Sequence, residues 1–203
     1  DLMPADLKEL YDESNNSSSN DTIEDIEKNL YNDILFCCEK IQSDYTLKDP
    51  LENTINDRVR NILEAKGYDV KDQTRHGSSL NGKDAGYVDI LIKKDQFPVS
   101  LFEALRLDSV KEQYIIDHVD KIYKYDTFGM RFNFLVSYVK TKDFESFFEK
   151  YKKFVGKIQY PYKLIENFTC AEKQYPEIRT IEMLLDREGI NTKLYHILMH
   201  LPK

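Results

Sequence analysis

The chain has 203 residues, of which 41% are hydrophobic and 12% aromatic. This is enough apolar material for the core of one substantial domain, and it excludes a wholly disordered chain. No stretch approaches the roughly 20 apolar residues that span a bilayer, and the N-terminus lacks a basic-then-apolar signal pattern, so we expect a soluble protein without a membrane partner. The three cysteines provide neither a disulfide framework nor paired metal-ligand spacing, and the expected location is the cytoplasm.

Negative charge is concentrated near the N-terminus. The net charge is −7, but residues 1–47 hold 12 Asp and Glu against 3 Lys, a balance of −9, which leaves +2 for residues 48–203. The second segment is therefore compatible with a polyanionic partner. We expect an acidic helical extension over residues 1–47, with a polar linker at 14–20, followed by one domain over residues 48–203.

The first half of the chain predicts two helices and three short strands. A helix with apolar residues at 3–4 spacing is expected from an Asp21 N-cap to Gln42, and a second from near Pro50 to Lys66, before Gly67. The expected strands cover residues 68–70, 87–92 and 99–105, with a glycine-rich loop at 73–86.

The second half predicts three helices and two strands. The helices are expected over residues 109–125, 143–155 and 176–187, a buried strand over 132–139 and a final strand over 193–200. This order of elements predicts an α/β fold with a mixed central sheet flanked by helices.

Two acidic residues interrupt apolar strands. Asp89 lies within Val88–Ile92, and Glu103 lies within Leu101–Leu105. Burying an unpaired carboxylate costs on the order of several kcal/mol, so each needs a compensating partner. If the two strands are neighbours joined by a turn over residues 93–98, the carboxylates converge at one end of the sheet, where a Mg²⁺ ion would neutralise them. The alternative is that each pairs with a nearby Arg or Lys or caps a loop.

This succession of a helix, the segment Gly67–Val70, a glycine-rich loop, Asp89 and Glu103 resembles the PD-(D/E)XK superfamily, which has the restriction-endonuclease-like fold. The resemblance covers about residues 50–140 and rests on order and spacing. It implies a nuclease that hydrolyses phosphodiester bonds, in DNA or in RNA, with Mg²⁺ or Mn²⁺ bound by Asp89 and Glu103. An acid from the first helix often joins this site in the family, and Asp57 is our first choice for it, with Glu52 second.

The chain departs from the family pattern in two places. Leu105 stands two residues after Glu103, where the family has Lys, so the resemblance assigns the catalytic cation to Lys83 or to Arg106 instead. Tyr87 stands where related sequences often have Glu. These departures leave open a catalytically degenerate member of the fold, which binds nucleic acid or a protein partner without cutting.

The loop from Thr74 to Lys83 combines hydroxyl groups, glycines and basic side chains. It suits contacts with phosphate, so we predict nucleic-acid binding by Arg75, Ser78 and Lys83, together with Arg106. The alternative is an ordinary solvated connection. His118 is read either as a packed histidine or as a catalytic base, and the first reading is favoured.

Domains of this family often act as effector modules of bacterial phage defence. In such a protein, the N-terminal helices would join the nuclease domain to a sensor, to an ATPase or to a second copy of the chain.

Overall fold

The computed structural model describes residues 21–44, 47, 49–72, 88–169 and 175–201. The chain divides into two compact units, residues 1–31 and residues 32–203. In the first unit, helix α2 (Ile23–Gln42, which continues into the second) begins with a capping box. Thr22 Oγ1 accepts a hydrogen bond from the Asp25 N–H at 3.1 Å, and the Asp25 carboxylate accepts one from the Thr22 N–H at 3.2 Å. The N-cap of this helix is therefore Thr22 and not the predicted Asp21.

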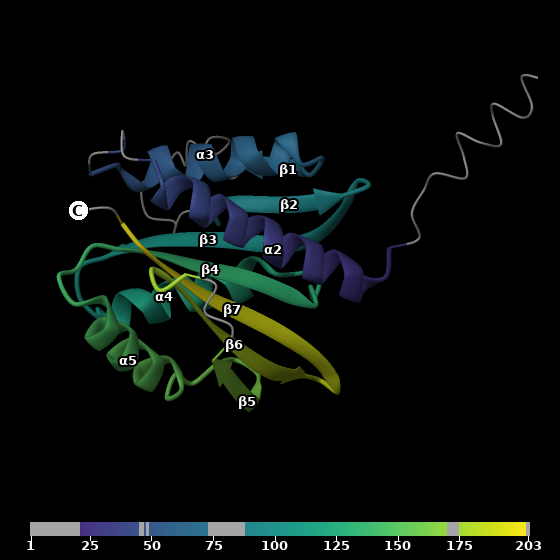
Figure 1. Ribbon diagram of the computed structural model, residues 1–203. Coiled ribbons are helices and arrows are strands. Elements are labelled where there is room, and N and C mark those ends of the chain that lie inside the picture. The colour runs from purple at the N-terminus through teal and green to yellow at the C-terminus, as the bar shows by residue number, and fades with distance from the viewer. Residues whose placement is uncertain (1–20, 45–46, 48, 73–87, 170–174, 202–203) are drawn as a thin grey trace, which may run out of the picture. The chain divides into compact units, whose positions relative to one another are not determined.

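The second unit is built on a seven-stranded sheet with the order β1-β2-β3-β4-β7-β6-β5 (Figure 1). The strands are β1 (Asp69–Asp72), β2 (Ile90–Lys94), β3 (Phe97–Leu107), β4 (Phe132–Val139), β5 (Lys163–Thr169), β6 (Ile178–Arg187) and β7 (Ile190–His200). β3, β4 and β7 are parallel to one another, and the remaining pairs are antiparallel. The sheet is therefore mixed, as predicted.

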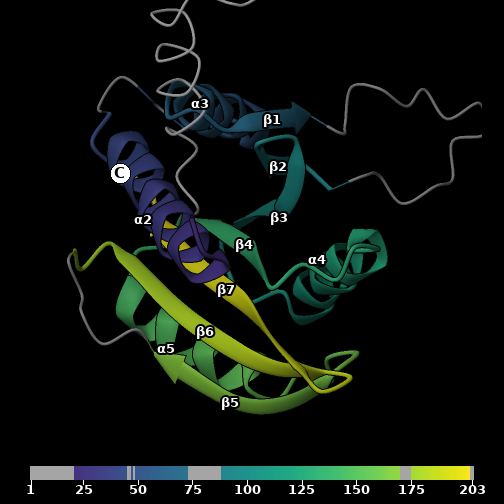
Figure 2. The same cartoon turned by 90° about the vertical axis from the view of Figure 1, so that its right-hand side faces the viewer.

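Helices cover both faces of this sheet, which confirms the α/β class. They are α3 (Glu52–Ala65), α4 (Glu112–Tyr125), α5 (Phe144–Val155) and the part of α2 from residue 32 onward. Leu105 and Leu135, at odd positions of β3 and β4, share a buried apolar cluster with residues of α4 and α5. The opposite face meets α3, where Tyr138 of β4 donates a hydrogen bond to Asn56. Figure 2 shows α3 beside β1 and β2, and α5 beside β6.

A two-residue turn joins β2 to β3, within the predicted range 93–98. Its central residues, Asp95 and Gln96, have φ angles of 49° and 70°. Positive φ at both central positions is the requirement of a type I′ turn, whose twist matches that of the flanking strands. The turn makes β2 and β3 antiparallel neighbours, as the sequence predicted, and so determines which residues of the two strands lie side by side.

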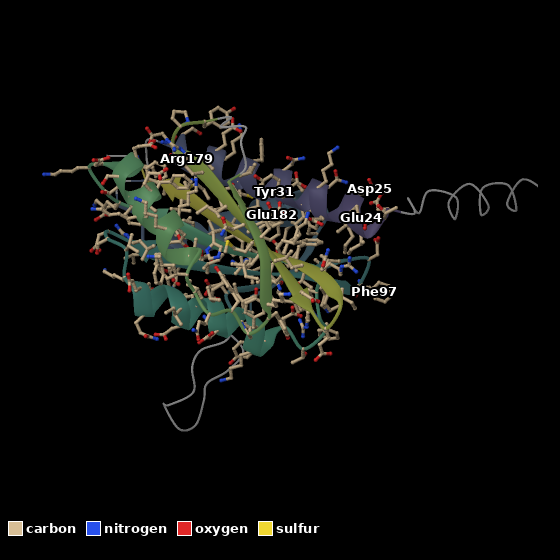
Figure 3. The ribbon with its side chains drawn as sticks, turned by 90° about the horizontal axis from the view of Figure 1, so that it is seen from below. Glu24, Asp25, Tyr31, Phe97, Arg179 and Glu182 are labelled. Carbon is tan, nitrogen blue, oxygen red and sulfur yellow. The ribbon has the colours of Figure 1, made fainter. Side chains whose placement is uncertain are left out.

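The predicted helix over residues 176–187 is wrong, because this segment is strand β6. Arg179 and Glu182 both lie on β6 (Figure 3), and their side chains have partners on opposite faces of the sheet. The Arg179 guanidinium lies 5.3 Å from the centre of the Phe148 ring on α5, whereas Glu182 pairs with Lys193 of β7 at 3.4 Å. Pairing with β5 and β7 on either side decides the conformation of this segment. β5 was not predicted and lies at the end of the sheet order.

Among the described residues, no helix is both long and apolar enough to cross a bilayer.

Candidate functional site

The candidate site lies where β2 separates from β3. Pairing between the two strands begins at Ile90 and Phe102, whereas β3 continues to Leu107, so the last part of β3 has no β2 residue opposite it. Two carboxylates accept hydrogen bonds from this part of β3. The Ala104 N–H donates to Asp89 Oδ2 at 2.8 Å, and the Arg106 N–H donates to the carboxylate of Glu52, in the first turn of α3. This part of β3 therefore holds acids from two other parts of the chain.

Asp89 and Glu103 are brought together by a second, reciprocal contact. The Asp89 N–H donates to Glu103 Oε2 at 3.0 Å, while the Asp89 carboxylate binds the residue that follows Glu103. Glu103 is completely buried. Each acid thus fixes the backbone beside the other.

Helix α4 supplies two nitrogen-bearing side chains to Glu103. Lys121 Nζ donates to Glu103 Oε1 at 2.5 Å, and His118 Nε2 lies 3.7 Å from the same oxygen. His118 Nδ1 lies 2.8 Å from the Tyr114 carbonyl oxygen. Because a carbonyl oxygen only accepts, Nδ1 carries the hydrogen, and Nε2 of the neutral ring has its lone pair available.

The charge of Asp89 disfavours the ionised forms of Glu52 and Glu103. Burial raises the pKa of Glu103, and the charge of Asp89 adds to this effect, whereas the Lys121 ammonium opposes it. Burial also raises the pKa of Asp89, and the pKa of Glu52 is raised first by burial and then by the charge of Asp89. A partly desolvated group of like charges attracts cations, and such groups are frequent at functional sites.

Asn56 connects this site to the interior of the sheet. The hydroxyl of Tyr138 donates to Asn56 Oδ1 at 2.8 Å, and the Asn56 side chain also hydrogen-bonds Asp89. Since Oδ1 accepts from the tyrosine, the amide NH₂ is the group that faces the carboxylate. Asn56 lies four residues after Glu52, on the same side of α3, so one side of this helix faces the site.

The donor chemistry of Glu52, Asp89 and Glu103 fits a divalent cation with hard oxygen ligands, such as Mg²⁺. As the side chains lie, however, no group of three or more His, Cys, Asp or Glu residues within the described ranges could hold one ion. The Lys121 ammonium instead contacts Glu103. The three carboxylates have the chemistry and the charge that a divalent cation requires. In their present arrangement, however, Glu103 accepts a hydrogen bond from the Lys121 ammonium.

Other residues predicted for the site have different surroundings. Asp57 pairs with Arg60 at 3.0 Å, and as the next residue after Asn56 it leaves α3 in another direction. The Arg106 guanidinium donates to the Pro50 carbonyl at 3.0 Å and pairs with Asp49, so it anchors the segment just before α3. Arg75, Ser78 and Lys83 lie outside the described residues.

Lys121 and Asn56 are the site residues that were not predicted from the sequence. Ile115, Val119 and Ile122 of α4 are buried, and His118 and Lys121 border this apolar stripe. A lysine beside an apolar stripe is ordinarily solvated, with its aliphatic part packed and its ammonium in water. The only signal in the sequence was its place one turn after His118, on the helix that follows Glu103.

A scan against protein-family models, a search of curated proteins and a search of solved structures each found no match to this chain.

Proposed function

We propose that the chain is a metal-dependent nuclease with a restriction-endonuclease-like core, which hydrolyses phosphodiester bonds. The observation that carries this proposal is the meeting of two acids and a lysine: Asp89, Glu103 and Lys121 join through hydrogen bonds of 2.5 and 3.0 Å. An acid before one strand, a second acid on the next strand and a nearby ammonium form the set of groups that the PD-(D/E)XK resemblance requires. Lys121 takes the role for which the sequence suggested Lys83 or Arg106.

Each side chain has a role in this proposal. Glu52, Asp89 and Glu103 would provide the oxygen ligands for Mg²⁺ or Mn²⁺, which when bound would supply an activated water and neutralise charge on the phosphate. Lys121 binds a non-bridging phosphate oxygen and offsets negative charge in the transition state. Asn56 holds the Asp89 carboxylate in place through its amide group.

His118 accepts a proton at Nε2. Its Nδ1–H is fixed on the Tyr114 carbonyl, and burial lowers the pKa of the ring, so the neutral form predominates at pH 7. A neutral imidazole whose free nitrogen lies near Glu103 is suited to take the proton of the attacking water.

The test is cleavage of a supercoiled plasmid, a single-stranded DNA and an RNA in the presence of Mg²⁺ or Mn²⁺. Asp89→Asn and Glu103→Gln are expected to lower the rate by at least about a hundredfold, because each removes a charged oxygen ligand of the metal ion. Asp117→Asn is the matched control, since it removes an exposed carboxylate of α4 that binds Gln113. Equal cutting by all four proteins would contradict the assignment of the site.

A binding module without catalysis is the second candidate. It is favoured by one observation: both oxygens of Glu103 accept hydrogen bonds from protein donors, as in a site that serves only to hold the fold together. Nucleic-acid binding by the wild type and by Asp89→Asn, with no cutting by either in Mg²⁺ or Mn²⁺, would establish this alternative.

A further inference from the structure

The contact between Lys121 Nζ and Glu103 Oε1, here called the Lys121 latch, occupies the oxygen that a metal ion would need. Glu103 Oε2 is bound by the Asp89 N–H, and Asp89 Oδ2 is bound by the Ala104 N–H. Among the described residues, no backbone N–H donates to Glu103 Oε1, and this is the oxygen that Lys121 contacts at 2.5 Å.

An ammonium group and a divalent ion exclude each other at this oxygen. A Mg²⁺ ion binds oxygen at about 2.1 Å, which would bring it within roughly 3 to 4 Å of an ammonium that shares the same oxygen. Two cations at that separation in a buried site repel each other strongly, because little water screens them. Glu103 is completely buried, and the Lys121 side chain is 19% exposed. Lys121 must move before an ion can bind.

Lys121 can move while its helix stays in place. Ile115, Val119 and Ile122 anchor α4 in the core, so its backbone is fixed. The lysine side chain itself is a flexible four-carbon stem that carries three donors. Leaving Glu103 is unfavourable unless the ammonium finds another anion. A phosphate group is such a partner, and it is the group that the proposed substrate brings to this position.

We propose that the Lys121 latch closes the acidic site against divalent cations, and that a phosphate of the nucleic acid opens it by drawing the ammonium away from Glu103. This inference rests on the proposed function, which supplies the nucleic acid. Its consequence is cooperativity: nucleic acid tightens the binding of the metal, and by reciprocity the metal tightens the binding of nucleic acid. A protein without substrate then holds little metal.

The test is direct Mn²⁺ binding to the full chain, measured by the electron paramagnetic resonance signal of free Mn²⁺. Lys121→Met removes the latch and is expected to bind Mn²⁺ roughly tenfold more tightly than the wild type or better. Lys124→Met is the matched control, because it removes the same charge from an exposed lysine of the same helix. Its Mn²⁺ affinity is expected to stay within about twofold of the wild type, since exposed charges are screened.

A phosphorothioate DNA duplex, which keeps the phosphate charge and resists cleavage, supplies the second arm of the experiment. It is expected to tighten Mn²⁺ binding to the wild type but not to Lys121→Met, in which the latch is already absent. Lys121→Gln, which is neutral and can still donate to Glu103, replaces the methionine variant if that variant does not fold. Lys121→Arg keeps the positive charge and is expected to behave as the wild type.

Equal Mn²⁺ affinity in the wild type and in the neutral Lys121 variants would overturn the latch, and so would an absence of Mn²⁺ binding in all of them. The latch is measured by binding and the nuclease by cleavage, so the two failures are distinguishable. Cutting without any effect of Lys121 on Mn²⁺ affinity contradicts the latch alone. A latch effect on Mn²⁺ without cutting contradicts the nuclease alone.

Discussion

Glu52 lies with its carboxylate against the backbone N–H of Arg106, and burial, followed by the charge of Asp89, raises its pKa. Asp57, on the same helix, pairs with Arg60 instead. We therefore expect Glu52→Gln to lower the cleavage rate by about 10- to 100-fold, as does the loss of a group that holds or tunes a metal site. Asp57→Asn, which removes the same charge five residues later, is expected to leave the rate unchanged. If Asp57→Asn slowed plasmid cleavage more than Glu52→Gln did, Asp57 and not Glu52 would be the acid that α3 contributes to the site.

His196 is a second buried titratable residue, away from the acidic site. The hydroxyl of Tyr151 lies 3.0 Å from its Nδ1, and the hydroxyl of Tyr160 lies 3.3 Å from its Nε2. Complete burial lowers the pKa of His196 to about 3. Tyr160 also donates to the Val155 carbonyl at 3.1 Å, so it accepts from Nε2–H, and Tyr151 donates to Nδ1. The neutral ring therefore satisfies both hydroxyl groups.

This burial predicts a loss of stability in acid. The unfolded chain binds a proton at His196 near pH 6.5, and the folded chain does so only near pH 3, so between these values the unfolded state holds more protons. The free energy of unfolding is expected to fall by up to about 1.4 kcal/mol for each pH unit below 6.5 because of this residue. Urea unfolding at several pH values, compared with His196→Gln, checks this. Parallel curves for the two proteins would show that His196 contributes nothing to acid sensitivity.

The β2–β3 hairpin stores strain in a turn without glycine. Gln96 has a φ of 70° and its side chain is exposed, so Gln96→Gly relieves an unfavourable backbone conformation and removes no buried contact. We expect the free energy of unfolding to rise by about 0.5–1 kcal/mol. Glu149→Gly, at an exposed position in the middle of α5, is the control and is expected to lower it by about 1 kcal/mol. A loss of stability in Gln96→Gly would contradict the turn conformation.

Local sequence patterns predicted the positions of most helices and strands, but they assigned one strand, β6, as a helix. β4 was predicted over its full length, 132–139, because a continuous apolar and β-branched run of that size suits a strand buried on both faces. β6 was mistaken for a helix, since its apolar residues at 178, 181, 184 and 185 also fit helical spacing. Its partners, β5 and β7, decide the matter, and such pairing between separate segments is not visible in a local window.

The same limit applies to the site. Asp89 and Glu103 were found because a carboxylate inside an apolar run is locally anomalous. Glu52 was ranked below Asp57 because the ranking used the distance along the chain to Gly67. That distance does not show which side of α3 faces β3. Lys121 was missed because its partner, Glu103, lies on another element, 18 residues away. The local sequence therefore predicted the two carboxylates that interrupt apolar runs, Asp89 and Glu103. The three-dimensional fold was needed to find Lys121, which neutralises Glu103.

At the scale of the whole molecule, the net negative charge of the chain disfavours the binding of nucleic acid, the proposed substrate. The chain carries −7, and residues 1–20 alone hold five Asp and Glu against one Lys, a balance of −4. Nucleic acid is a dense polyanion, so a net negative protein binds it through local contacts against a long-range repulsion. This repulsion acts through the solvent and is screened beyond about 8 Å at physiological ionic strength.

Removal of residues 1–20 reduces the net charge to −3 without touching Glu52, Asp89, Glu103 or Lys121. We expect the shortened chain to bind the phosphorothioate duplex severalfold more tightly than the full chain at low salt, because the repulsion is weaker. The difference is expected to vanish near 0.5 M salt, where the screening length falls to about 4 Å. Fluorescence anisotropy across a salt series, in EDTA so that metal binding does not contribute, measures both affinities. A difference that persists unchanged at high salt would show that residues 1–20 act by occupying the binding surface instead of through their charge.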